Sequence, residues 1–119
     1  RRFDFTIGLT YDTSSQQMRE VVSRLQAMLR EREKVDTESV LVHFVTFNDS
    51  SLDIRIICDV FIPNWNDYLG EQEQINLAIM EIVEDMGLSM AFPSRSVYIE
   101  SVPKPQPKAA TTNKDKPAP

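Results

Sequence analysis

The sequence predicts an α+β fold, a ferredoxin-like β-α-β-β-α sandwich with a detached C-terminal strand. Residues 3–11 and 52–62 place apolar residues at every second position, which is typical of strands, and residues 40–47 are rich in β-branched and aromatic residues. Two further segments repeat apolar residues at steps of three and four, as an amphipathic helix requires. Their order along the chain favours two helices packed on one face of a mainly antiparallel sheet.

The first strand is expected over residues 3–11, where every second residue is apolar: Phe3, Phe5, Ile7, Leu9 and Tyr11. A helix is expected next, because Thr13 with Gln16, or Ser14 with Gln17, has the spacing of a capping box. The buried stripe of that helix would consist of Met18, Val21, Val22, Leu25, Met28 and Leu29.

A β-hairpin is expected over residues 40–62. Residues 40–47 are rich in β-branched and aromatic side chains, and Asn48-Asp49-Ser50 has the composition of a turn. The second strand of the hairpin would end at Pro63 and present one apolar face made of Leu52, Ile54, Ile56, Cys58, Val60 and Ile62.

The second helix is expected from about Asp67, whose charge suits a helix N-terminus, to Gly87, a natural C-terminal stop. Its buried stripe would consist of Ile75, Ala78, Ile79, Ile82, Val83 and Met86. The β-prone segment that follows is separated from the helix by Pro93 and leads only into a polar tail, so it lacks an evident partner within the chain. This pattern predicts assembly and not catalysis.

Composition divides the 119 residues into a domain at 1–92, a strand at 93–101 and a tail at 102–119. From residue 103 onward the tail has no large hydrophobic residue, so disorder is expected there. The net charge is −5, and because the tail contributes +3, the remainder carries −8. An acidic body argues against nucleic acid as a partner, since such binders neutralise phosphates with basic side chains.

No catalytic constellation is present in the sequence, so an enzyme is not expected, and neither a cofactor nor a metal site is predicted. His43 is the only histidine: a metal ligand or acid-base group is conceivable, but an ordinary strand residue is favoured. Cys58 is the only cysteine, which excludes an internal disulfide and favours a packed core thiol over a reactive one. No apolar run is long enough to cross a bilayer, and a start at Arg1 without methionine suggests a fragment of a longer polypeptide.

Four passages together resemble the cytoplasmic C-terminal domain of the small-conductance mechanosensitive channel (MscS) family. They are residues 5–12 (FTIGLTYD), residues 48–52 (NDSSL), Asp67-Tyr68 at a helix start, and residues 86–99 (MGLSMAFPSRSVYI). Each passage is short and made of common residues, but their order and spacing extend over residues 1–101.

The resemblance implies a pore-forming homo-oligomer, typically a heptamer, whose membrane spans precede residue 1. In that family the strand after the proline packs beside its copies as a parallel barrel, and ring closure would satisfy both of its edges. The expected oligomerisation residues are Phe92, Pro93, Arg95, Ser96, Val97, Tyr98 and Ile99. We expect Val97 and Ile99 to point into the barrel.

The implied function is that of a cytoplasmic cage, or vestibule, in a tension-gated channel that releases ions and small solutes after hypo-osmotic swelling. The location would be the cytoplasmic side of a bacterial inner membrane, with an organellar membrane as the alternative. Acidic side chains of the second helix would attract cations and give a mild bias, or would be only a solvated face: Glu71, Glu73, Glu81 and Glu84.

Two rival hypotheses share a similar order of elements. One is the metal-sensing cytoplasmic domain of a cation transporter, and the other is an ACT-type ligand-binding domain that dimerises. Trp65 and Tyr68 leave a further choice open, since they could line a pocket or a subunit contact, or simply pack over the end of the sheet.

Overall fold

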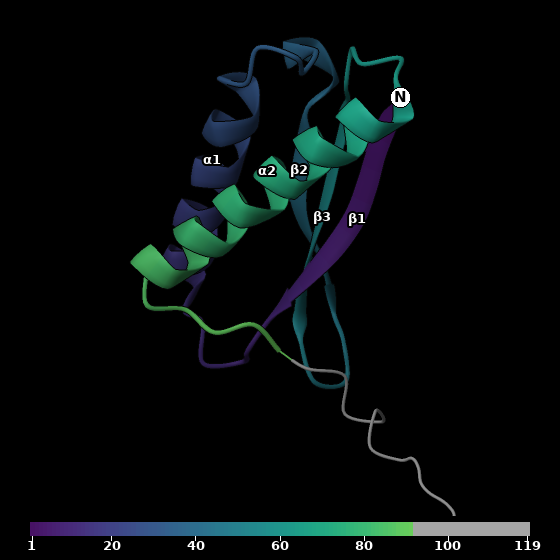
Figure 1. Ribbon diagram of the computed structural model, residues 1–119. Helices are drawn as coiled ribbons and strands as arrows, with labels where there is room; N and C mark the ends of the chain where they lie inside the picture. The colour runs from purple at the N-terminus through teal and green to yellow at the C-terminus, as the bar shows by residue number, and fades with distance from the viewer. Residues whose placement is uncertain (92–119) are drawn as a thin grey trace, which may run out of the picture.

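The computed structural model describes residues 1–91, which form one antiparallel sheet covered by two helices (Figure 1). The elements are β1 (Arg2–Leu9), α1 (Ser15–Arg30), the short 3-10 helix η1 (Thr37–Ser39), β2 (Leu41–Phe47), β3 (Leu52–Asp59) and α2 (Trp65–Asp85). The strands lie in the order β1-β3-β2, so β3, the last strand in the sequence, is the central strand of the sheet. The predicted α+β class, with two helices and an antiparallel sheet, is confirmed.

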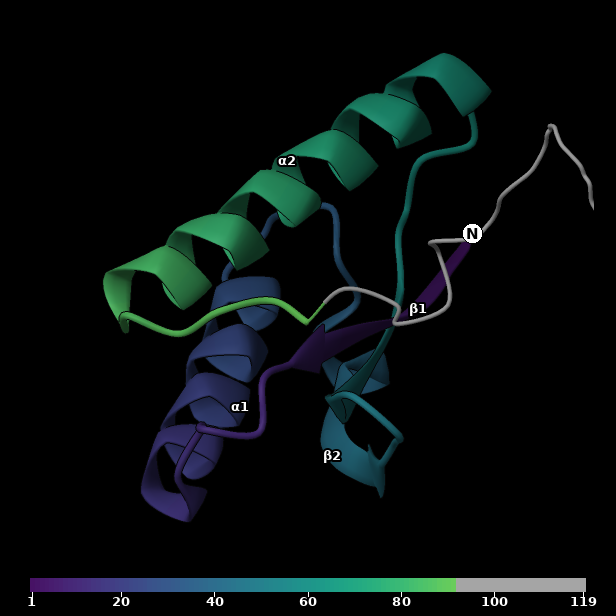
Figure 2. The same cartoon turned by 90° about the horizontal axis from the view of Figure 1, so that it is seen from below.

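The register of the sheet places one apolar row toward the helices. Phe3 pairs with Cys58 and Ile7 with Ile54 across β1 and β3, while Val42 pairs with Ile56 across β2 and β3. The register shifts between Phe44 and Thr46, which indicates a bulge in edge strand β2. Both helices lie on the same side of the sheet (Figure 2).

The helix ends follow local sequence signals. Ser14 is the N-cap of α1, and its side chain and that of Gln17 form the capping box, so the second of the two predicted boxes is the one used. Asn64 caps α2, and Asp67 lies in the first turn. Gly87 has a φ of 70° and donates its N–H to the Glu84 carbonyl, which ends α2 in a left-handed C-terminal turn.

The core is a single cluster between the helices and the sheet. Both helices contribute buried residues that belong to their predicted apolar stripes. The side chains predicted for the apolar face of the second hairpin strand are also buried, except Ile62, which is partly buried. The helix residues that are buried are Met18, Val21, Leu25, Leu29, Tyr68, Ile75, Ile79 and Val83.

Several boundaries differ from the sequence-based prediction. Strand β1 ends at Leu9 and not at Tyr11, whose hydroxyl donates to the Asn48 carbonyl from an exposed position. Strand β3 ends at Asp59, and Val60 continues only as an isolated bridge to Val35. In both cases the strand ends where its pairing with the neighbouring strand ends. Alternation of apolar residues along one strand does not show where its partner strand ends.

Candidate functional site

The chain that leaves α2 runs back along the outer edge of β1. Met90 forms an antiparallel bridge with Leu9, the Ala91 N–H donates to the Gly8 carbonyl at 2.9 Å, and the Thr10 N–H donates to the Ser89 carbonyl at 3.1 Å. The return segment is visible beside β1 in Figures 1 and 2. The exit from α2 is therefore attached to the sheet as far as Ala91, which the sequence did not predict.

The register of this short ladder defines where the next hydrogen bond would fall. Each step of two residues along β1 toward Arg2 advances the return segment by two, so position 93 would stand opposite Thr6. That pair belongs to the hydrogen-bonded set, in which the residue at 93 must donate its N–H to the Thr6 carbonyl. The sequence has proline at position 93, and proline has no N–H to donate in such a bond.

The predicted oligomerisation residues lie outside the part of the chain that the structure describes, which ends at residue 91. The predictions for Phe92, Pro93 and Arg95, and for the strand residues 96–99, therefore remain predictions.

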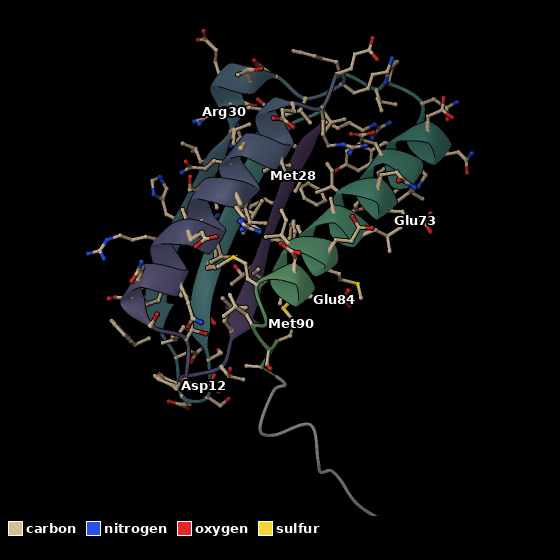
Figure 3. The ribbon with its side chains drawn as sticks, turned by 90° about the vertical axis from the view of Figure 1, so that its left-hand side faces the viewer. Asp12, Met28, Arg30, Glu73, Glu84 and Met90 are labelled. Atoms are coloured by element: carbon tan, nitrogen blue, oxygen red, sulfur yellow. The ribbon has the colours of Figure 1, made fainter. Side chains whose placement is uncertain are left out.

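The four predicted vestibule glutamates fall into two groups. Glu73, Glu81 and Glu84 are exposed on α2, and none of them forms an ion pair within residues 1–91. Figure 3 labels Glu73 and Glu84 on this helix. The Glu71 side chain is only 12% exposed and binds Arg32 through two contacts, of 2.5 and 3.2 Å. This hydrogen-bonded pair raises the pKa of the Arg32 guanidinium and ties the end of α1 to α2.

The outward side of α2 also carries large apolar side chains, of which the sequence analysis singled out only Trp65. Trp65 is 57% exposed, Met80 49%, Leu77 44% and Leu69 41%. We call these four residues the α2 ridge. The signal for Leu69, Leu77 and Met80 was present in the sequence, because they occur at helical spacing but out of phase with the buried stripe that includes Ile75 and Ile79.

A hollow of about 320 Å³ lies between α1 and edge strand β2, on the side of α1 away from α2. We call it the α1–β2 groove, and its lining consists of Ser15, Met18, Arg19, Val22, His43 and Phe44. Deeper along the same side of α1, the Gln26 amide donates to the Val42 carbonyl at 3.1 Å, which satisfies one acceptor on the exposed edge of β2.

Positive charge gathers on the same side of α1. Arg19 and Arg30 lie three helical turns apart on one face of the helix, and neither makes an ion pair with another described residue. By contrast, Arg24 on the flank that faces α2 is paired with Glu20 and with Asp85. Residues 56–91 contain no Lys or Arg at all.

The remaining candidate residues have structural positions. Cys58 is fully buried, and burial, helped by the negative charges of Asp59 and Glu71, raises the pKa of its thiol to about 11. His43 is exposed on β2 at the groove. Tyr68 is buried over the end of the sheet and donates its hydroxyl to the Arg2 carbonyl at 3.2 Å.

Trp65 stacks on Tyr68 with ring centroids 5.6 Å apart, and the Arg1 guanidinium lies 5.1 Å from the centroid of the Trp65 ring. The sequence left three alternatives open for these residues: lining a pocket, forming a subunit contact, or packing over the end of the sheet. Tyr68 packs over the sheet, whereas Trp65 remains mostly exposed to solvent.

Ion pairs link β1 and β3 on the face of the sheet that the helices do not cover. The Arg55 guanidinium binds Asp4 through two hydrogen bonds, of 3.1 and 2.8 Å, and these bonds lower the pKa of the Asp4 carboxyl. Arg2 contacts Asp59 at 3.2 Å across the same pair of strands. Within residues 1–91 no three metal-ligating side chains gather, and neither helix has the length and apolar character to span a bilayer.

These features define a class of protein: a small acidic α+β domain with exposed apolar side chains on one helix and a separate groove, lined partly by Arg19, beside the other. Residues 3–90 match the family described as "Mechanosensitive ion channel MscS, C-terminal". The chain belongs to the MscS family, as its four sequence passages indicated. The members of this family are channels and not enzymes.

Two curated relatives define the extent of the match. An uncharacterized MscS family protein of Aquifex aeolicus is 44% identical over 105 residues, covering 87% of this chain and 28% of the relative. The low conductance mechanosensitive channel YnaI of Escherichia coli is 33% identical over 107 residues, covering 89% of this chain and 31% of the relative. The chain thus spans less than a third of the length of either protein.

Solved structures share the fold at low sequence identity. MSL1 of Arabidopsis thaliana superposes with a TM-score of 0.71 at 19% identity, covering 78% of this chain and 34% of that one. The closed state of MscS from Helicobacter pylori superposes with a TM-score of 0.56 at 16% identity, covering 85% of this chain and 38% of that one.

Proposed function

We propose that this chain is the cytoplasmic vestibule domain of a tension-gated mechanosensitive channel that releases solutes on hypo-osmotic shock. The observation that carries the proposal is the match of nearly the whole domain to the C-terminal part of MscS-family channels, including one relative described as a low conductance mechanosensitive channel. It favours the channel hypothesis over the metal-sensing and ACT-type alternatives. Membrane spans would belong to the rest of the longer polypeptide, in a bacterial inner membrane or an organellar membrane.

The test of this function uses the full-length protein. Expression in bacteria that lack their own mechanosensitive channels should raise survival after a sudden drop in osmolarity, and membrane patches should show currents that open with suction. Normal expression in the membrane without either response would overturn the proposal.

The assembly proposed for the domain is a homo-oligomeric ring, a heptamer in the full-length channel, closed by a parallel barrel of the segment 93–101. The sandwich would have ferredoxin-like topology, with residues 89–91 at the position of a fourth strand beside β1. The antiparallel bridge of Met90 to Leu9 supports this topology. The register argument at Pro93 supports release of the following strand to its copies, because the ladder on β1 cannot continue regularly there.

A pair of variants of the full-length channel tests the release step. Pro93→Ala supplies the missing N–H opposite Thr6, so the segment should compete for the edge of β1 and the yield of cross-linked rings should fall. Ala91→Pro removes the observed bond to Gly8 and should leave ring yield unchanged or higher. Equal ring yields for Pro93→Ala and the unchanged channel would refute the role of Pro93.

Charge filtering is the third part of the proposal. Glu73, Glu81 and Glu84 form an unpaired acidic row on α2, whose field would enrich cations within the ~8 Å screening length at physiological salt. Glu71 would contribute less, since Arg32 neutralises it.

Replacing these three exposed glutamates with Gln in the full-length channel should shift the reversal potential under a salt gradient toward lower cation preference. Glu33→Gln with Glu38→Gln, on the connection between α1 and β2, is the control for charge loss elsewhere on the surface. An unchanged reversal potential in the triple variant would exclude a filtering role.

A further inference from the structure

Two surfaces of the domain are complementary and face away from each other. The α2 ridge is apolar and is flanked by the unpaired carboxylates of Glu73, Glu81 and Glu84. The α1–β2 groove is hollow and has an apolar floor that includes Met18, Val22 and Phe44. The helix that forms its wall carries Arg19 and Arg30, which form no ion pair within residues 1–91. One side of the domain thus carries exposed apolar side chains with negative charge, and a different side carries an apolar groove with positive charge.

The geometry prevents the two surfaces from meeting within one molecule. The Arg24–Asp85 and Arg32–Glu71 pairs bind the facing flanks of α1 and α2 together. The groove lies on the opposite flank of α1, toward β2, and the ridge lies on the outward side of α2. Figure 3 shows Arg30 and Glu73 directed to opposite sides of the helix layer.

We propose that the α2 ridge of one copy docks in the α1–β2 groove of the next copy. This inference rests on the proposed homo-oligomer and assigns the contact within it. Such a contact is heterologous, because it joins two different surfaces, and repetition of a heterologous contact closes into a ring when the rotation permits. Burial of the ridge removes exposed apolar area from water, and its carboxylates approach guanidinium groups that form no ion pair within residues 1–91 of their own copy.

A second copy fits both surfaces better than another partner does. Every copy supplies one ridge and one groove, so equal numbers are guaranteed without a further protein. An acidic ligand suits the groove but would be repelled by the ridge, and a basic ligand would show the reverse preference. Only an occupant with both charges on separate surfaces satisfies the two sites together.

The test is a cross-link between the two surfaces in the full-length channel. Met80→Cys places a thiol on the ridge and Val22→Cys places one in the groove, while the buried Cys58 is shielded from a short bismaleimide reagent. Chains that carry both substitutions should form a ladder of covalent multimers beyond the dimer. Each single variant should remain monomeric on a denaturing gel.

Charge reversal sharpens the same measurement. Arg19→Glu with Arg30→Glu, or Glu73→Arg with Glu84→Arg, places like charges across the contact, and either pair should lower the cross-link yield about tenfold. Combining the two pairs should restore the yield. Glu33→Arg with Glu38→Arg makes the same charge change away from both surfaces and should have no effect.

The outcomes separate this inference from the function on which it rests. A native-sized ring with intact tension-gated currents, but with no ridge-to-groove cross-link, would overturn the inference and leave the function standing. A ladder that stops at the dimer would also overturn it, because it would indicate a two-fold contact. If the unsubstituted channel formed no ring and showed no tension-gated currents, the proposed function itself would be refuted.

Discussion

Helices α1 and α2 lie side by side on the same sheet, but they differ in how much apolar surface they leave exposed to solvent. The α1 helix buries Leu25 and Leu29 completely, and no large apolar side chain on it is exposed. The α2 helix also buries a stripe, which includes Ile75 and Ile79, but it exposes four large apolar residues on its outward side. A helix with two apolar sides needs two packing partners, and the described domain supplies one.

The difference indicates that one side of α2 belongs to the core, while the other carries the contact that we propose between copies. The sheet-facing stripe belongs to the core, so its loss should unfold the domain. The ridge contributes little to the isolated fold, so its loss should leave folding intact and weaken contacts between copies. Predictions for single substitutions follow from this division.

The largest effect is expected from a matched pair of leucines. Leu25→Ala in α1 opens a cavity in the core and should lower the free energy of unfolding by about 2–5 kcal/mol. Leu77→Ala on the ridge should change it by less than about 0.5 kcal/mol. Urea denaturation of the isolated chain measures both, and similar losses would contradict the separation of core and ridge.

A pH titration probes the core beneath the helices through Cys58. Its thiol titrates at about 11 in the folded protein, above its ordinary value of 9.0, so the unfolded state loses the proton first as pH rises. Stability contributed by the neutral thiol is complete below pH 9.0 and is lost between 9.0 and about 11, by about 3 kcal/mol. Cys58→Ala should be less stable at neutral pH but lose less on going to alkaline pH, and equal slopes would be inconsistent with this origin.

Disruption of the Arg32–Glu71 ion pair between the two helices should lower stability by an intermediate amount. Glu71→Gln leaves the partly buried Arg32 without its counter-charge, and since a quarter of the Arg32 side chain remains exposed, the expected loss of stability is about 1–2 kcal/mol. Glu73→Gln, two positions along α2 and exposed, should cost less than about 0.5 kcal/mol. Thermal unfolding of the two variants decides whether the two glutamates differ as their positions indicate.

Two glycines of the α2 region should respond in opposite directions. Gly87→Ala forces a side chain into the left-handed conformation that ends the helix and should destabilise the chain by about 1 kcal/mol. Gly70→Ala lies inside α2, where an added methyl group meets nothing within 4 Å, and should stabilise it by up to about 1 kcal/mol. Midpoints of urea denaturation that move in the same direction would contradict this assignment.

Local sequence signals predicted much of the molecule. The capping box at Ser14, the turn at residues 48–50 and the stop at Gly87 each depend on a few neighbouring residues, and each is observed. The predicted class was confirmed because period-two and period-3.6 patterns reflect which face of an element is buried. The same periodicity indicated that Glu73, Glu81 and Glu84 are exposed, but it did not predict the pairing of Glu71 with Arg32, which is distant in sequence.

The sequence by itself determined which segments are strands and helices, which side of each is apolar, and to which family the chain belongs, since these follow from local periodicity and from short motifs in order. Only the tertiary structure decided the attachment of residues 89–91 to β1, the exposure of the α2 ridge, and the placement of Arg19 beside the groove. The physical reason is that exposure, pairing and register depend on which distant elements meet, and a periodic pattern states that a face needs a partner without stating whether the fold supplies one.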